Sequence, residues 1–244
     1  FEKAFTIKVN DTTAPVAGTC TPPAYAKATP ITVTYSGASD SGGAGLNHVE
    51  LWYKKGSGGT WTNSGLTQTG AAGSFNFTAV TTEDTYYFDL VAEDNVGNRS
   101  TVASGNGDGG TYYDPNPPTV TGVTSSTANG TYTQGQVITI QVSFSEAVTV
   151  AGGTPTLTLE TGAIDRSAGL SSGSGSATLV FNYTVQAGDA SPDLDYTGTN
   201  ALSAAGATIR DAAGNDATLT LPAPGASGSL GANKNIVIDA VAPS

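Results

Sequence analysis

Carboxylate and amide side chains gather near the turns of this chain, and their oxygens are the ligands that Ca²⁺ prefers in proteins. In each half of the chain they come from three segments that are far apart in the sequence. If the fold brings each set together, each half holds a calcium site. The candidate ligands are Asp11, Asp40, Glu93 and Asp94 in the first half, with Asn10 and Asn98 beside them, and Asp114, Asn116, Glu146, Asp211 and Asn215 in the second half, with Asp216 adjacent.

Turn geometry gives a second explanation for the same residues. Asp, Asn and Gly are common in turns because they make Asx hydrogen bonds and tolerate left-handed backbone. The segments 93–98 and 211–215 agree with either explanation. Glu146 favours the ion, since turn geometry gives no reason for a glutamate there.

Asp239 follows the last apolar strand and is expected to begin a further calcium site. The other ligands of that site would come from loops of a following domain, so we expect it to be incomplete within these residues. Asp189, Asp193 and Asp195 form another acidic cluster toward the same end of the second half, and they are candidates for the same joint.

Catalysis is not expected from this sequence. His48 is the only histidine, and alternation along its strand places it opposite the apolar row, facing solvent. A Ser-His-Asp or Cys-His arrangement would therefore depend on this one residue, and no nucleophile elbow is present. No Cys/His cluster has zinc spacing, and no glycine loop precedes a helix to hold phosphate.

The candidate ligands must be positioned by β-strands. Gly is abundant, at 32 residues, only 12% of residues are charged, and no stretch has sustained helical periodicity. Alternating apolar and polar residues predict strands, most clearly at 31–35 and 138–144. Short strands with turns about every 8–12 residues are typical of immunoglobulin-like sandwiches. The sequence therefore predicts an all-β chain of two tandem immunoglobulin-like β-sandwich domains.

One signature occurs three times: an apolar strand that ends in an acidic residue and is followed by a proline-bearing step. The acidic residues are Asp11, Asp114 and Asp239, separated by roughly the 100 residues of one sandwich domain. A unit that ends and restarts in this way is typical of a tandem array. We predict the terminal strand of a preceding repeat at 1–10, domains at 11–113 and 114–239, and the start of a following repeat at 240–244. The absence of Met is expected of a processed or excised segment.

Several segments resemble known repeats. Residues 86–98 (YYFDLVAEDNVGN) resemble the penultimate strand and following turn of bacterial fibronectin type III-like and Ig-like repeats. Residues 143–148 (SFSEAV), 209–215 (IRDAAGN) and 235–239 (NIVID) look like the Ig-like or cadherin-like repeats of very large bacterial surface proteins. In such a sandwich the N-terminal linker, the loop after the second strand and the turn before the last strand meet at one end. This would unite the candidate ligands of each half.

The resemblance implies secreted, non-catalytic modules that extend a surface adhesin outward, often with calcium at the joints. It places the chain outside the cell, at the cell surface. Its partners would be neighbouring repeats of the same polypeptide or filament, and a cell-surface or glycan receptor. A net charge of −11 argues against nucleic acid, and no apolar run is long enough for insertion into a membrane.

Two other functions stay open. Trp52 alternates out of phase with its apolar neighbours, and Trp61 follows within one hairpin, so sugars could stack on them. The chain would then be a carbohydrate-binding or accessory module of a secreted polysaccharide-degrading enzyme. Alternatively, if the strand at 1–10 pairs with a neighbouring chain, the protein is a filament or surface-layer subunit that assembles by strand donation.

Overall fold

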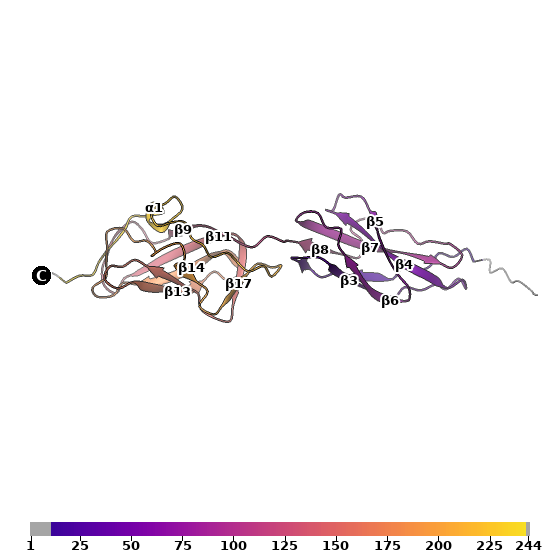
Figure 1. Cartoon of the computed structure of the whole chain (residues 1–244), viewed down its shortest axis with the longest axis horizontal. Coiled ribbons are helices and arrows are strands. Elements are labelled where there is room, and N and C mark those ends of the chain that lie inside the picture. Colours follow the sequence, from indigo (N-terminus) through magenta and orange to yellow (C-terminus); the bar gives the residue numbers. More distant parts are fainter. Residues whose placement is uncertain (1–10, 243–244) are drawn as a thin grey trace, which may run out of the picture. The chain divides into compact units, whose positions relative to one another are not determined.

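The computed structural model of the chain describes residues 11–242 and divides into two compact units, Phe1–Pro115 and Asn116–Ser244. The strand predicted at 1–10 lies outside the described residues. Apart from one short helix, the regular elements in residues 11–242 are all strands (Figure 1), so the prediction of an all-β chain is confirmed. Within the described range, no helix has the length and apolar character needed to cross a membrane.

The first unit contains two sheets, with strand orders β1-β3-β6 and β2-β8-β7-β4-β5. Alternation decides which way the side chains point. In β3, Ile31, Val33 and Tyr35 are buried, while the threonines between them are exposed. The strands are β1 (Thr19–Thr21), β2 (Tyr25–Ala26), β3 (Ile31–Ser36), β4 (Leu46–Lys55), β5 (Thr62–Gln68), β6 (Ala72–Phe77), β7 (Asp84–Asp94) and β8 (Gly109–Tyr113).

Apolar side chains from both sheets form a single core in this unit. Aromatic rings lie at its centre, where Phe77 meets Phe88 edge-on at 5.1 Å between ring centroids and Tyr53 at 4.6 Å. Each such pair contributes about 0.5–1.5 kcal/mol beyond the area it buries. The first unit is therefore a β-sandwich-like layer pair. Its buried core residues are Cys20, Ile31, Val33, Tyr35, Ala38, Val49, Leu51, Phe75, Phe77, Tyr86, Phe88, Leu90 and Ala92.

The second unit has a larger sheet in which β11 is the central strand. β11 pairs with β14 and β9 over its first half and with β17 over its last three residues, and its register shifts between Ser143 and Val148. The smaller sheet has the order β10-β18-β15. The elements are β9 (Val120–Ser125), β10 (Gly130–Tyr132), β11 (Val137–Ala151), β12 (Thr156–Leu159), β13 (Arg166–Ser172), β14 (Ser176–Thr184), β15 (Ala190–Ser191), β16 (Leu202–Ser203), β17 (Thr208–Arg210), α1 (Leu230–Asn233) and β18 (Ile236–Asp239).

The core of the second unit also contains the alternating apolar side chains that the sequence predicts to face inward. Ile138, Ile140, Val142 and Phe144 of β11 are buried, and Phe181 of the neighbouring β14 is fully covered. Side chains from the smaller sheet, including Ile236 and Ile238, join the same cluster. Both sheets thus contribute to one hydrophobic core.

In both units the chain pairs first with one sheet and then crosses to the other. In the first unit, β1 is antiparallel to β3, and the chain then passes to the other sheet, where β2 runs parallel to the last strand, β8. In the second unit, β9 is antiparallel to β11, and β10 then runs parallel to the last strand, β18. The opening segment of each unit therefore contributes to both of its sheets.

A buried tyrosine ties the loop before β7 to the sandwich. The Tyr86 hydroxyl donates to the Thr82 carbonyl at 3.0 Å and accepts from the Thr81 N–H at 2.9 Å. Tyr86 is 1% exposed, so these bonds replace those that its hydroxyl would make with water in the unfolded chain. The hydroxyl fixes where the chain enters β7, the strand that carries Asp94 at its far end.

Replacing Tyr86 by Phe is expected to lower the free energy of unfolding of the first unit by about 1–2 kcal/mol, because the Thr81 N–H is left without its buried acceptor. Chemical denaturation monitored by circular dichroism measures this. Tyr87→Phe is the matched control, since the neighbouring ring packs beneath Lys54 and lies on the opposite side of the strand. Equal losses in the two variants would contradict the assignment.

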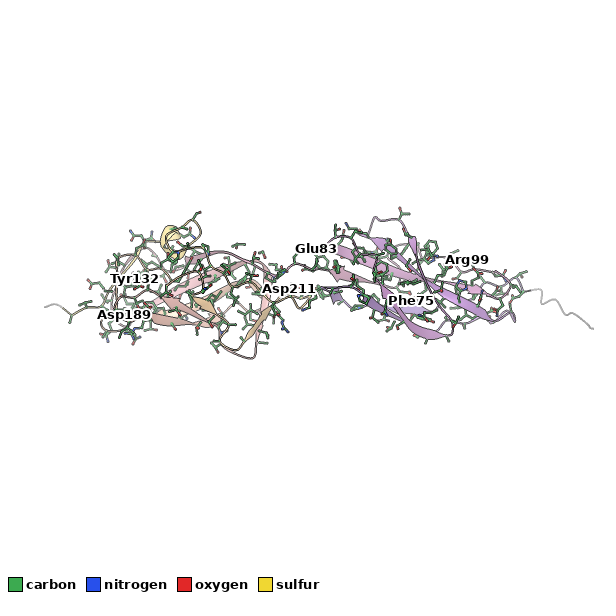
Figure 2. The ribbon with its side chains drawn as sticks, in the orientation of Figure 1. Phe75, Glu83, Arg99, Tyr132, Asp189 and Asp211 are labelled. Carbon is green, nitrogen blue, oxygen red and sulfur yellow. The ribbon has the colours of Figure 1, made fainter. Side chains whose placement is uncertain are left out.

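A buried acidic residue, Asp189, links the segment between β14 and β15 to neighbouring strands. Asp189 is 1% exposed (labelled in Figure 2) and accepts from Tyr183 Oη at 2.6 Å, the Gln186 N–H at 2.8 Å and Arg166 Nε at 2.9 Å. Burial raises the pKa of Asp189, but these three hydrogen bonds and the Arg166 charge outweigh it, so the net shift is downward. Asp189 is therefore held as a charged, fully bonded carboxylate.

Asp189→Asn is expected to destabilise the second unit by about 3 kcal/mol at neutral pH, because Arg166 loses its buried partner. The folded pKa lies below the ordinary value of 3.8, so this stabilisation is present above about pH 4 and is lost as pH falls through the folded pKa. Denaturation curves of both proteins from pH 7 downward test the prediction. Asp165→Asn, at an exposed neighbour, should have no such effect. A difference between wild type and Asp189→Asn that stays constant to pH 2 would refute it.

Candidate metal sites

The turn after β7 is organised around the carboxylate of Asp94. Its Oδ1 accepts from the N–H groups of Val96 and Asn98 at 2.9 and 2.8 Å, and its Oδ2 accepts from Asn98 Nδ2 at 2.7 Å. Burial raises the pKa of Asp94, but the hydrogen bonds from Asn98, Val96 and Gly97 lower it more. Asp94, at 1% exposure, is therefore a buried carboxylate that stays ionised.

The second unit contains the same turn after β17. Asp211 Oδ1 accepts from the Asn215 N–H at 2.8 Å, and Oδ2 accepts from Asn215 Nδ2 at 2.7 Å. In both units the N–H of the aspartate donates to the carbonyl of this asparagine, and the glycine N–H donates back to the aspartate carbonyl. The spacing Asp-x-x-Gly-Asn thus produces one local structure in two different sequences. Figure 2 labels Asp211.

The asparagine of each turn reaches the segment that enters its own unit. Asn98 Nδ2 also donates to the carbonyl of Asp11 at 3.0 Å, and Asn215 Nδ2 donates to the carbonyl of Asn116 at 3.3 Å. The turn is therefore tied to the segment at the start of its unit.

Three acidic residues predicted as ligands come together in the first unit. Ligand atoms of Asp11, Asp40 and Asp94 all lie within 4.8 Å of one another. They come from the entry segment, the loop after β3 and the turn after β7. Among the described residues, none of the ion pairs formed by Lys, Arg or His reaches any of the three. Within residues 11–242 the group presents hard oxygen atoms with no ion-paired Lys, Arg or His beside them, a donor set of the kind that suits a divalent cation.

Backbone N–H groups from the loop after β3 hold this arrangement in place. Gly42 and Gly45 donate to the two oxygens of Asp40 at 2.9 and 2.7 Å, and Ala44 donates to Asp11 Oδ2 at 3.0 Å. The loop comes so close that a Cβ on Gly42 would lie 2.2 Å from Asp11 Oδ1. Gly45 has φ of +81°, in the left-handed region that favours glycine. The glycine-rich loop is shaped around the two carboxylates.

Only some of the ligands predicted for the corresponding site lie within the second unit. Carboxylate oxygens of Glu146 and Asp211 lie within 4.8 Å of each other. Glu146 lies in β11 where the strand register shifts, between Ser143 and Val148. Asn116 and Asn215 join through the hydrogen bond described above. Asp114 belongs to the first unit, where its N–H donates to the Ala26 carbonyl at 2.9 Å.

Glu93 is not brought into the group around Asp94. Successive residues of a strand point to opposite faces, and Glu93 of β7 lies on the other face from its neighbour. There its Oε2 pairs with Arg99 Nη1 at 2.5 Å. The same guanidinium reaches Glu50 Oε2 through Nη2 at 2.6 Å (Arg99 is labelled in Figure 2).

This face carries a second group of titratable side chains that the sequence analysis missed. Ligand atoms of His48, Glu50 and Glu93 lie within 4.8 Å of one another. Burial raises the pKa of Glu50, but hydrogen bonds from Trp52, Arg99 and His48 bring it below its ordinary value. Arg99 already supplies positive charge to both glutamates, so this group needs a metal less than the aspartates do. In the sequence, the one hint of this group is that Glu50 and Trp52 lie two residues apart and therefore on the same side of a strand.

Both tryptophans contact other side chains of the first unit. Trp52 Nε1 donates to Glu50 Oε2 at 2.9 Å, and the Trp61 ring lies beneath Lys54 Nζ, 5.2 Å from the ring centroid. Lys54 is buried and donates to the carbonyls of Ser57 and Gly105. A shallow groove beside Trp52 is lined by Val91, Arg99, Ser100, Thr101 and Val102.

The acidic residues near the end of the second unit do not form a comparable group. Asp189 is paired with Arg166, and Asp195 accepts from the N–H groups of Tyr196 and Gly225. Asp193 is exposed. Asp239 is exposed at the end of β18, and no potential metal-binding group among the described residues includes it.

No protein-family model matches this chain, and no curated protein matches it significantly.

Proposed function

We propose that the chain is a non-catalytic, extracellular structural repeat of a bacterial surface adhesin, whose units bind calcium at the end where each joins the preceding one. The observation that carries this proposal is the convergence of Asp11, Asp40 and Asp94 from three separate segments into one carboxylate group. Adhesion would then depend on spacing: rigid units in series hold a distal binding site away from the cell.

The chain path supports the further proposal that both units are immunoglobulin-like, the first of the fibronectin type III-like kind and the second Ig-like or cadherin-like. In both, the opening segment pairs first with one sheet and then runs parallel to the last strand of the other. In the first unit, Tyr86 makes the hydrogen bonds of a tyrosine corner, a hallmark of immunoglobulin-like sandwiches.

The donor set supports calcium over other cations. All three side chains of the first group are carboxylates, and hard oxygen ligands suit Ca²⁺, whereas zinc and copper sites favour sulfur or imidazole. Each aspartate is held by backbone N–H groups, so the oxygens are already arranged before an ion arrives. Mutual repulsion of three close carboxylates is the unfavourable term that a divalent ion removes.

The same reasoning extends to the second unit. Glu146 and Asp211 supply two carboxylates there, and the sequence predicts that Asp114 and Asn116 join them. A cation that binds both a linker and the loops of the following unit would reduce the freedom of that linker. Calcium would thus set the stiffness of the array.

Calcium titration of the full chain by calorimetry is expected to show binding, and Asp94→Asn is expected to remove one site. Free Ca²⁺ at about a hundredfold above Kd should raise the free energy of unfolding of the first unit by about 2.7 kcal/mol. Chelator should reverse the effect. Glu146→Ala should abolish the response of the second unit in the same way.

Glu93→Gln is the matched control, because it removes a carboxylate adjacent in sequence to Asp94 but on the opposite face of β7. It should leave the calcium response intact and cost at most about 1 kcal/mol for its exposed ion pair with Arg99. A calcium response lost equally in Glu93→Gln and Asp94→Asn, or no response in the wild type, would overturn the proposed site.

Gly42→Ala is expected to weaken calcium binding by the first unit at least about tenfold, a loss of about 1.4 kcal/mol. The new methyl group would lie on Asp11 Oδ1, so this carboxylate must leave the group. Gly43→Ala changes the adjacent glycine, where a Cβ meets nothing within 4 Å but the φ of +98° is strained. It therefore controls for backbone effects. Unchanged affinity in Gly42→Ala would show that Asp11 is not a ligand.

A further inference from the structure

The sequence contains two Asn–Gly steps, Asn106–Gly107 and Asn129–Gly130. Such a step can react with itself, because the backbone nitrogen of the glycine can attack the side-chain amide carbon of the asparagine. Glycine permits this best, since it has no Cβ to obstruct the approach. Both asparagines are exposed, so exposure alone does not distinguish them. The hydrogen bonds around each step do.

Asn129–Gly130 is held on both sides by the second unit. The Gly130 N–H donates to the Asn235 carbonyl at 3.1 Å, and Asn129 Oδ1 accepts from the Asn235 N–H at 3.1 Å. Gly130 also begins β10, whose register places it opposite Ile236 of β18. The nucleophilic nitrogen and the amide that it would attack are thus both fixed in other bonds.

Asn106–Gly107 lies in the irregular segment between β7 and β8, which is anchored on either side. The Gly105 carbonyl accepts from Lys54 Nζ at 2.7 Å, and the Asp108 N–H donates to the Phe88 carbonyl at 3.0 Å. Between these anchors, the Asn106 side chain and the Gly107 N–H make no hydrogen bond within residues 11–242. Within this range, neither reacting group is therefore held in another hydrogen bond.

The fold requires the glycine at this step. Gly107 has φ of +64°, and a Cβ there would lie 2.5 Å from the Phe88 carbonyl oxygen and 2.8 Å from the Trp61 ring. Any larger residue would displace the segment from β7. The reactive pair therefore cannot be removed by changing Gly107 without disturbing the packing around Trp61.

We propose that Asn106 is a site of spontaneous deamidation in the folded chain, with water as the second reactant, and that Asn129 is protected. The Gly107 nitrogen forms a bond to Asn106 Cγ, the Cγ–Nδ2 bond breaks, and ammonia leaves with the proton lost from the Gly107 nitrogen. Water then opens the resulting succinimide at either carbonyl. The product is aspartate or isoaspartate at position 106, and the net reaction consumes one water and releases one ammonia.

The new carboxylate would be formed beside an existing charge network. The Lys54 ammonium donates to the carbonyl of the adjacent Gly105 at 2.7 Å. Asp108 lies two residues further on, with its Oδ2 accepting from the Cys20 N–H at 2.7 Å. Isoaspartate also adds one backbone atom between the two anchors, so the Lys54 contact must adjust. Deamidation therefore adds a negative charge to this segment and, where isoaspartate forms, lengthens its backbone.

The experiment incubates the folded full chain at mildly alkaline pH and follows both Asn–Gly peptides by mass spectrometry after digestion. The same chain in urea provides the reference in which both steps are exposed. We expect Asn106 to convert at least about tenfold faster than Asn129 in the folded chain, and the two rates to converge in urea. Asn106→Gln, whose longer side chain would need a larger ring, should not acquire the acidic charge variant seen on isoelectric focusing.

Two results would overturn the proposal. One is equal conversion of Asn106 and Asn129 in the folded chain, which would mean that the Asn235 contacts give no protection. The other is intact Asn106 in the folded chain after both steps have converted in urea, which would mean that the segment between β7 and β8 holds Asn106 in an unreactive geometry.

Discussion

A carboxylate that is buried at the end of a β-sandwich must recover the hydrogen bonds that it loses with water. At Asp94 and Asp211, the turn that follows supplies them from its own backbone and from one asparagine amide. The rest of the arrangement depends on this constraint. Because the asparagine is fixed by the aspartate, its remaining N–H points to the entry segment of the unit and holds it in place.

The same turn occurs in two units with different strand orders and different loops. What they share is the position of the turn next to the entry segment, and a second carboxylate from elsewhere, Asp40 in one and Glu146 in the other. Turn geometry explains the aspartate, glycine and asparagine by themselves. It does not explain why further carboxylates should be placed against an already charged group, and that surplus of negative charge is what the calcium proposal accounts for.

Local patterns were enough to predict the all-β class and several of its strands. Period-two alternation identified β3 and the first half of β11, because one face of each is buried. Asp94 and Asp211 were also predictable, since their turn is a local motif. The link between Glu50 and Arg99 was not, because it depends on the pairing register of β4 and β7, which no local pattern records. Very short strands such as β10 and β15 offer too few residues for any alternation.

The parallel pairing of β2 with β8, and of β10 with β18, has a mechanical consequence. In each unit these are an early strand and the last strand, so tension applied through the two ends pulls the pair in opposite directions along its length. Hydrogen bonds between such strands are loaded in shear and must break together, whereas bonds in an unzipping hairpin break one at a time. Each unit therefore has a short parallel contact, of two paired residues in β2–β8 and three in β10–β18, that tension through its ends would load in shear.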